Sequence, residues 1–292
     1  MKPAPFDYYS PASIDEALDL LAELGYEVKV LAGGQSLIPA MNFRMAIPPA
    51  LLDLTRIDDL VYIRPTDDGG LQIGAMTTDT AVERDPMVKE RFPLIIEAMP
   101  TIAHPQIRNR GTFGGAIAHA DPTGQLPAVC LALGASVRIL SKNGERTLPL
   151  DEFFLGPFTT ALEPEELLAE VILPPTPPRT GTSYDQMARQ AGAQALVGIA
   201  SVITLDEDGR VAAARIGMLS VGETPMLAVE AASQLIGNQP TAEIIAQAAE
   251  TAATVDIVEP PSDIHSSPDY RRHLVKVLVN RSLTRAVERA RA

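Results

Sequence analysis

Two glycine-rich stretches contain the residues that are best suited to bind a ligand. The first glycine loop is Leu31-Ala-Gly-Gly-Gln-Ser-Leu37, directly after an apolar run, and the second is Arg108-Asn-Arg-Gly-Thr-Phe-Gly-Gly115. Adjacent glycines permit positive φ and leave no Cβ in a ligand's way, so successive N–H groups can point into one concavity. A glycine pair after a strand is also a common turn. Two such loops together nevertheless indicate a phosphate-binding site.

Neither glycine loop has a familiar phosphate signature. The chain contains no G-x-G-x-x-G and no G-x-x-x-x-G-K-[ST], which argues against an ordinary Rossmann site and against a Walker loop. Arg44, Arg108 and Arg110 flank the two loops. An arginine there suits bidentate contact with an oxyanion, or forms a salt bridge with one of the 37 acidic residues. The pattern predicts a less common nucleotide-binding scaffold.

The other reactive side chains indicate neither a metal site nor a nucleophile. His119 and Asp121 lie two residues apart, but no third ligand follows at metal spacing. The chain has no G-x-S-x-G elbow and no Cys–His signature. Asp121 precedes a proline and suits a turn or a helix N-cap, or alternatively accepts hydrogen bonds from nucleotide hydroxyls. We therefore expect no catalytic residue and no metal ligand.

Composition restricts the classes of partner. A chain of 292 residues with 46% hydrophobic residues can form about two domains with a substantial core. Its formal net charge of −13 argues against nucleic acid and anionic membranes as partners. Cys130 is the only cysteine, so this chain cannot ligate an iron–sulfur cluster. No export signal or membrane-spanning run is evident, and we expect a cytoplasmic protein without membrane insertion.

The elements that position the first loop follow from local patterns. Ser13-Ile-Asp-Glu16 is a capping box, and an apolar helical face after it predicts a helix over residues 13–24, ended by Gly25. A strand at about 27–31 then leads into the loop. The remaining N-terminal predictions are strands at 51–54, 60–63, 71–74 and 167–173, helices beginning near 78 and spanning 93–99 and 126–133, and an Asn-Gly hairpin over 136–150.

A proline-rich segment separates this region from the rest. Pro174-Pro-Thr-Pro-Pro178 cannot form regular structure and marks a domain boundary or stiff connector. Beyond it we expect two long antiparallel strands, 195–205 and 211–219, and three helices near 227–236, 241–254 and 270–291. The last third therefore predicts a sheet with helices on one face, an α+β layer.

The order of these motifs resembles the FAD-binding (medium) subunit of the molybdenum hydroxylases. That family includes carbon monoxide, nicotine and quinoline dehydrogenases and the flavin domain of xanthine dehydrogenase. The motifs that carry the resemblance are Leu31-Ala-Gly-Gly-Gln-Ser-Leu-Ile-Pro39, Met41-Asn-Phe-Arg44, Ile102-Ala-His104, Ile107-Arg-Asn-Arg-Gly-Thr-Phe-Gly-Gly115, Ala118-His-Ala-Asp-Pro122 and Tyr270-Arg-Arg-His-Leu274.

The resemblance implies an α+β fold. It predicts an FAD-binding domain over residues 1–175, of the vanillyl-alcohol-oxidase type, with two α/β subdomains split near 55–60. A C-terminal α+β domain over 179–292 would close over the flavin. By the family's pattern, residues 31–37 and 112–115 wrap the FAD diphosphate, and 102–104 and 118–121 line other parts of the cofactor. The implied cofactor-binding residues are Val30, Leu31, Ala32, Gly33, Gly34, Gln35, Ser36, Leu37, Ile102, Ala103, His104, Gly111, Thr112, Gly114, Gly115, Ala118, His119 and Asp121.

The resemblance also implies an electron-transfer subunit. A large partner subunit would carry the molybdenum cofactor, a small one the 2Fe–2S clusters, and the assembly would be a dimer of heterotrimers. The electron acceptor stays open among oxygen, a quinone and NAD⁺. Two other functions also stay open: a stand-alone FAD-dependent oxidase and a non-catalytic nucleotide-binding protein.

Two positions depart from the family's pattern. Gln125 stands where an acidic residue is frequent, and Gly192-Ala-Gln194 stands where Gly-Asp-aromatic is common. A carboxylate and a ring that the family places near the flavin are therefore missing, and the flavin environment is expected to differ.

Overall fold

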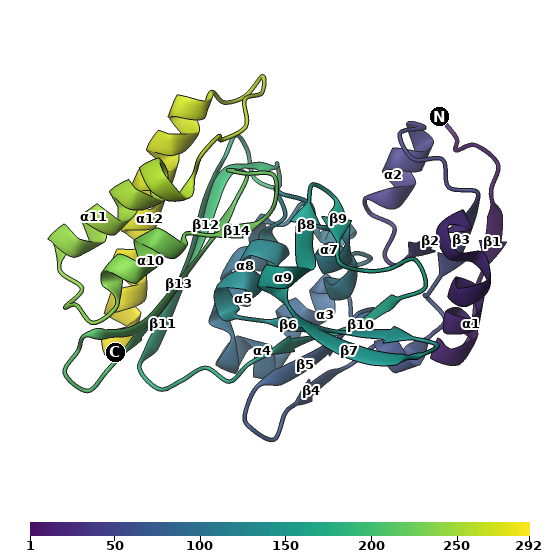
Figure 1. Ribbon diagram of the computed structural model, residues 1–292, viewed down its shortest axis with the longest axis horizontal. Helices are drawn as coiled ribbons and strands as arrows, with labels where there is room; N and C mark the ends of the chain where they lie inside the picture. Colours follow the sequence, from purple (N-terminus) through teal and green to yellow (C-terminus); the bar gives the residue numbers. More distant parts are fainter.

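The computed structural model describes residues 1–292 as three blocks in a row, with the chain's N-terminal residues at one end and its C-terminal domain at the other (Figure 1). The N-terminal block is a parallel three-stranded sheet in the order β1-β3-β2. Its elements are β1 (Asp7–Tyr9), α1 (Ile14–Leu24), β2 (Val28–Leu31), α2 (Leu37–Asn42) and β3 (Ala50–Asp53).

The predicted capping box begins α1. The Ser13 hydroxyl accepts from the Glu16 N–H at 3.2 Å, and the Glu16 carboxylate accepts from the Ala12 N–H at 2.8 Å. Ala17, Leu18 and Leu21 then bury one helix face. This face packs into a cluster with Leu52 of β3, which fixes the sheet that carries the first glycine loop.

The middle block contains an antiparallel sheet in the order β4-β5-β10-β6-β7. Its strands are β4 (Ile63–Pro65), β5 (Leu71–Gly74), β6 (Ser136–Ser141), β7 (Gly144–Pro149) and β10 (Leu167–Leu173), with a small hairpin of β8 (Phe154–Gly156) and β9 (Thr159–Thr160). Its helices are α3 (Asp79–Arg84), α4 (Pro86–Arg91), α5 (Pro93–Ala98), α6 (Pro105–Arg108), α7 (Phe113–His119), α8 (Gln125–Leu133) and α9 (Leu150–Phe153).

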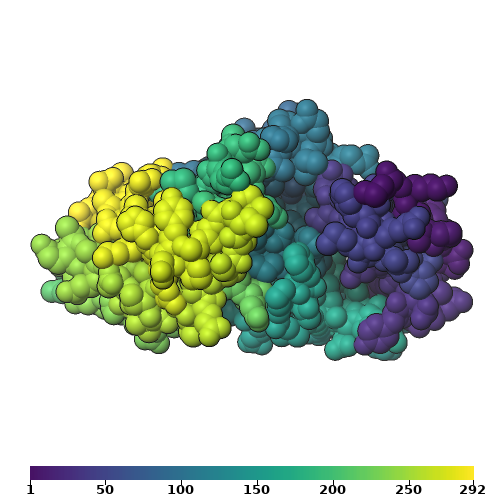
Figure 2. Space-filling view, turned by 90° about the horizontal axis from the view of Figure 1, so that it is seen from above, coloured from purple at the N-terminus to yellow at the C-terminus, as the bar shows by residue number.

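The C-terminal block is an antiparallel sheet in the order β11-β12-β13-β14. Its elements are β11 (Thr180–Ala188), β12 (Ala195–Leu205), β13 (Val211–Leu219), β14 (Met226–Leu227), α10 (Val229–Leu235), α11 (Ala242–Thr251) and α12 (Pro268–Arg291). Figure 1 shows α10–α12 on one face and α5 and α8 of the middle block on the other. Figure 2 shows the same three blocks from above. No helix combines the length and apolar character that crossing a membrane requires.

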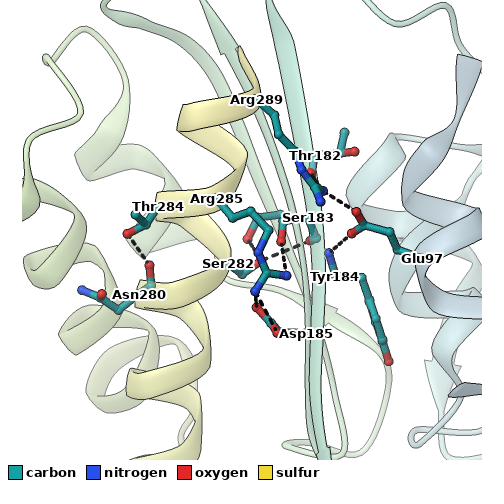
Figure 3. A network of polar contacts seen from close by, with 11 residues as sticks. Glu97, Thr182, Ser183, Tyr184, Asp185, Asn280, Ser282, Thr284, Arg285 and Arg289 are labelled. Carbon is teal, nitrogen blue, oxygen red and sulfur yellow. Dashed lines mark hydrogen bonds and ion pairs between the residues drawn. The ribbon is translucent and has the colours of Figure 1, made fainter. Parts of the chain in front are cut away.

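A polar network joins the middle and C-terminal blocks (Figure 3). The Glu97 carboxylate on α5 accepts from the Tyr184 N–H of β11 at 2.9 Å and also pairs with Arg289 of α12. On the other side of β11, the Ser282 hydroxyl donates to the Ser183 carbonyl at 3.1 Å. One strand is thus held from both faces, and its position relative to the middle block is fixed.

The predicted α+β fold is confirmed, with local differences that include α7, which begins inside the second glycine loop at Phe113. The strand expected at 60–63 is wrong: residues 58–60 form a 3₁₀ turn, and β4 begins at Ile63. The strand β11 was not predicted, because its run TGTSYDQMA is polar. Thr182 and Ser183 are nevertheless buried, and the Ser183 carbonyl accepts from a hydroxyl on α12. A polar strand of this kind has no apolar pattern to detect.

Candidate cofactor site

The first glycine loop has free hydrogen-bond donors. It connects β2 to α2, and the backbone N–H groups of Gly33, Gly34, Gln35 and Ser36 donate to no acceptor in the protein. Gly34 has φ +73°, a conformation that favours glycine. Since backbone N–H groups are obligatory donors, a consecutive run of unpaired ones is suited to bind an anion.

The second glycine loop donates to the protein itself. The Phe113 N–H bonds to the Thr77 carbonyl at 2.9 Å, and the Gly114 N–H bonds to the Ala75 carbonyl at 3.1 Å. The Gly115 N–H bonds to the Thr112 hydroxyl at 3.1 Å, which caps α7. These three donors are therefore already used, and of the N–H groups from Arg108 to Gly115 only that of Thr112 donates to no acceptor in the protein. The loop is thus held mainly by the protein itself and forms a wall.

The two glycine loops lie against each other. A Cβ added to Gly33 would stand 2.1 Å from the Arg110 carbonyl oxygen, a distance that no packing tolerates. Glycine at this position therefore brings two segments that are distant in sequence into direct contact. The contact is as important for the site as the free donors, because it places the second loop as a wall beside the first.

A cavity of about 260 Å³ lies between the loops. Residues 30–37 form one side, and the other is formed by Asp79, Ile102, Ile107, Gly111, Thr112, Gly115, Ala116, Ala118 and His119. A second cavity of about 390 Å³ lies on the other side of the first loop and includes Asn42, Asp53, Thr55 and Arg110. The first loop thus lies between two cavities. An elongated ligand whose centre is bound by this loop could place one end in each cavity.

Fourteen of the eighteen predicted cofactor residues line the first cavity. Of the other four, Gly114 does not line the cavity and packs against Ala75 instead. Ala103 and His104 lie against the C-terminal block, where a Cβ on Gly192 would stand 2.7 Å from the His104 ring. Asp121 lies in a separate cavity of about 470 Å³, and its carboxylate accepts from the Thr123 N–H and hydroxyl, each at 2.8 Å.

Three residues of the first cavity escaped sequence reasoning: Asp79, Ile107 and Ala116. Asp79 is 4% exposed, and burial raises its carboxyl pKa to about 7. The sequence presented it only as a helix start after Thr78. Nothing local could have placed it beside the second loop, because that contact is tertiary.

The remaining polar groups of the site have assignable roles. Burial lowers the pKa of His119, so its imidazole is neutral at pH 7, and the ring lies 5.0 Å from that of Phe158. Arg108 is buried and pairs with Glu83 at 3.2 Å, so this salt bridge stabilises the fold. Arg110 lines the second cavity and can face an anion there.

Both departures from the family's pattern lie between the middle and C-terminal blocks. The Gln125 amide donates to the Thr101 carbonyl at 3.3 Å and to the Gln186 side chain at 3.4 Å. Gln194 lines the separate cavity that contains Asp121. Between these two blocks, the side-chain amides of Gln125 and Gln194 therefore stand where the family's pattern would place a carboxylate and an aromatic ring.

Two family models match the chain. The model described as an FAD binding domain in molybdopterin dehydrogenase matches residues 4–176. The model described as a CO dehydrogenase flavoprotein C-terminal domain matches residues 182–286.

Known proteins match over the whole chain. The 6-hydroxypseudooxynicotine dehydrogenase complex subunit alpha of Paenarthrobacter nicotinovorans is 42% identical, over 100% of this chain and 97% of that protein. The solved carbon monoxide dehydrogenase of Hydrogenophaga pseudoflava has a chain with TM-score 0.95 and 39% identity, covering 99% of each chain. Quinoline 2-oxidoreductase from Pseudomonas putida 86 gives TM-score 0.92 and 36% identity, covering 100% of each chain.

Proposed function

Since the chain belongs to the family of FAD-binding medium subunits of molybdenum hydroxylases, we propose that it binds FAD between its two glycine loops and serves as the electron-transfer subunit of its complex. The observation that carries this proposal is the row of free N–H groups from Gly33 to Ser36. The diphosphate of FAD offers the acceptor oxygens that such a row requires.

The chain's own residues bind and orient the cofactor. Four backbone donors neutralise part of the diphosphate charge, which suits a protein whose net charge is −13. Ile102, Ile107 and Ala118 give the cavity apolar walls, and the neutral ring of His119 also lines it. When bound, FAD supplies the redox chemistry, taking electrons from a relay and passing them to an acceptor.

The other redox centres belong, in this proposal, to partner subunits. Cys130 is the only cysteine, it is fully buried in α8, and burial raises the pKa of its thiol, so it is neither a cluster ligand nor a reactive group. An iron–sulfur small subunit and a molybdenum-containing large subunit would supply the relay and the substrate site, in a cytoplasmic dimer of heterotrimers. The relatives' names, "complex subunit" and "medium chain", support a multi-subunit assembly.

The proposal includes the division into domains 1–175 and 179–292. It is supported by the proline-rich segment between β10 and β11 and by a separate hydrophobic cluster formed by β12, β13 and α10–α12.

A visible spectrum tests this function. The purified chain is titrated with FAD, and organic substrates of the related complexes are then added anaerobically, with and without the copurifying subunits. We expect FAD to bind and to bleach only when the partners are present. Bleaching in the lone chain would identify a stand-alone oxidase, and binding with no bleaching in the native complex would indicate a non-catalytic nucleotide-binding protein.

A further inference from the structure

Asp79 is a polar side chain in the first cavity to which the proposed function gives no role. It is the first residue of α3, and its backbone N–H donates to the Gly111 carbonyl at 2.9 Å. A Cβ on Gly111 would stand 2.6 Å from the Asp79 Oδ2 atom. The carboxyl therefore lies directly beside the second glycine loop, on the side that lines the cavity.

The Asp79 carboxyl has no hydrogen-bond partner in the protein. Its Oδ1 atom is fully buried and unpaired, and the residue is 4% exposed. The nearby cation, Arg108, donates instead to Glu83 at 3.2 Å and to the Ile102 carbonyl at 3.0 Å. Because an unpaired buried carboxyl costs free energy, its presence requires a reason outside the fold.

The fold offers no such reason. The N-cap of α3 is Thr78, whose hydroxyl accepts from the Ala81 N–H at 3.2 Å, and the Asp79 carboxyl accepts none of the helix's N–H groups. An amide or an alanine would satisfy the backbone equally well. A buried carboxyl without a partner in the protein is suited to accept a hydrogen bond from a ligand.

We propose that the Asp79 carboxyl is a cofactor-binding group that accepts a hydrogen bond from an N–H or O–H donor of FAD. This inference rests on the proposed function. The phosphates are not the partner, because ionised phosphate presents no donor and repels a carboxylate. Ile102 and Ile107 line the same cavity, so a flat ring with one edge donor, or a sugar hydroxyl, fits this chemistry.

The test compares FAD affinity of the flavin-free, full-length chain and its variants by flavin fluorescence. We expect Asp79→Ala to weaken FAD binding about ten-fold or more, since a hydrogen bond to a charged acceptor is lost. Asp79→Asn keeps an acceptor oxygen and is expected to lose less. Asp67→Asn removes the same charge from an exposed turn and serves as the matched control, with unchanged affinity.

Competition with ADP and with FMN identifies the donor's source. Weaker ADP binding by Asp79→Ala places the donor in the adenosine half, and weaker FMN binding places it in the flavin and ribityl half. Either result supports the inference.

Thermal unfolding separates a binding role from a structural one. We expect flavin-free Asp79→Asn to unfold at a higher temperature than the parent chain, because a buried unpaired carboxyl is removed. Unchanged FAD affinity of Asp79→Ala would overturn the inference, and a lower unfolding temperature of Asp79→Asn would then identify a structural role for the carboxyl. Failure of the parent chain to bind FAD would instead contradict the proposed function.

Discussion

The two glycine loops share a sequence pattern but differ in what their N–H groups do. The first leaves the consecutive donors from Gly33 to Ser36 free, whereas the second uses those of Phe113, Gly114 and Gly115 within the protein and leaves only that of Thr112 free. One loop is therefore equipped to bind an anion, and the other is a structural wall that holds it in place. A glycine pair thus indicates a close approach of two backbone segments, and only the hydrogen bonds of its N–H groups show whether a ligand or the fold requires that approach.

The largest predicted effect is at the wall. In Gly114→Val the new Cβ would stand 2.5 Å from the Cα of Ala75, against a backbone atom that cannot turn aside as a side chain could. We expect the free energy of unfolding of the flavin-free chain to fall by about 4 kcal/mol, above the usual cost of overpacking because the backbone itself must move. Denaturant titration measures it. A stable Gly114→Val chain would contradict the structural role of the second loop.

The matched change in the first loop is expected to act on binding. A Cβ on Gly34 would meet only the side chains of Ile38 and Leu31, at 3.1 and 3.2 Å, although φ is +73°. We expect Gly34→Ala to cost about 1 to 2 kcal/mol of stability and to weaken FAD binding much more than it weakens the fold. Equal losses of stability from Gly34→Ala and Gly114→Val would show that the two loops do not differ in their structural role.

The pH dependence of stability tests the one buried carboxyl beside the wall. The pKa of Asp79 rises from 3.8 to about 7 on folding because of burial, opposed by Arg108 and reinforced by Glu83. The folded chain thus binds this proton more tightly, so the stability contribution is complete below pH 3.8 and is lost as pH rises through 7.

In the flavin-free chain, we expect Asp79→Asn to remove this loss, a difference of up to about 4 kcal/mol between acid and neutral pH. Unfolding titrations of both chains at several pH values measure it, with Asp67→Asn as the control. Parallel pH profiles for the parent and Asp79→Asn would show that the carboxyl ionises normally.

The smallest predicted effect is on stability, and it concerns the hydroxyls of Thr112 and Ser36. Thr112 caps α7 by accepting from the Gly115 N–H, whereas the Ser36 side chain caps nothing. We expect Thr112→Ala to cost about 1 kcal/mol of stability and Ser36→Ala to leave stability unchanged. A similar loss from both would show that the first loop is also held by its side chains.

Local patterns were sufficient where the structure is local. The capping box at Ser13 predicted α1, and the Asn-Gly pair predicted the hairpin of β6 and β7. Gly134 ends α8 with φ +71°, as its position after an apolar run indicates. Each of these features depends on residues that are close in sequence, so their chemistry could be predicted without the fold.

Tertiary contacts were not accessible in this way. The acceptors for the second loop are carbonyls of Ala75 and Thr77, and the partner of the β11 residue Ser183 is Ser282 on α12. The unpaired state of Asp79 likewise depends on Arg108 bonding elsewhere. The sequence identified most residues of the first cavity, but their division into donors and wall required the three-dimensional structure.

Amide hydrogen exchange, resolved by NMR on the flavin-free chain and after FAD addition, tests whether the first glycine loop binds the diphosphate. We predict that the amides of Gly33 to Ser36 exchange fast without FAD and become protected when it binds, whereas those of Phe113 and Gly114 are protected throughout. If the first-loop amides are already protected without FAD, or stay unprotected when FAD is bound, the first loop is not the diphosphate cradle.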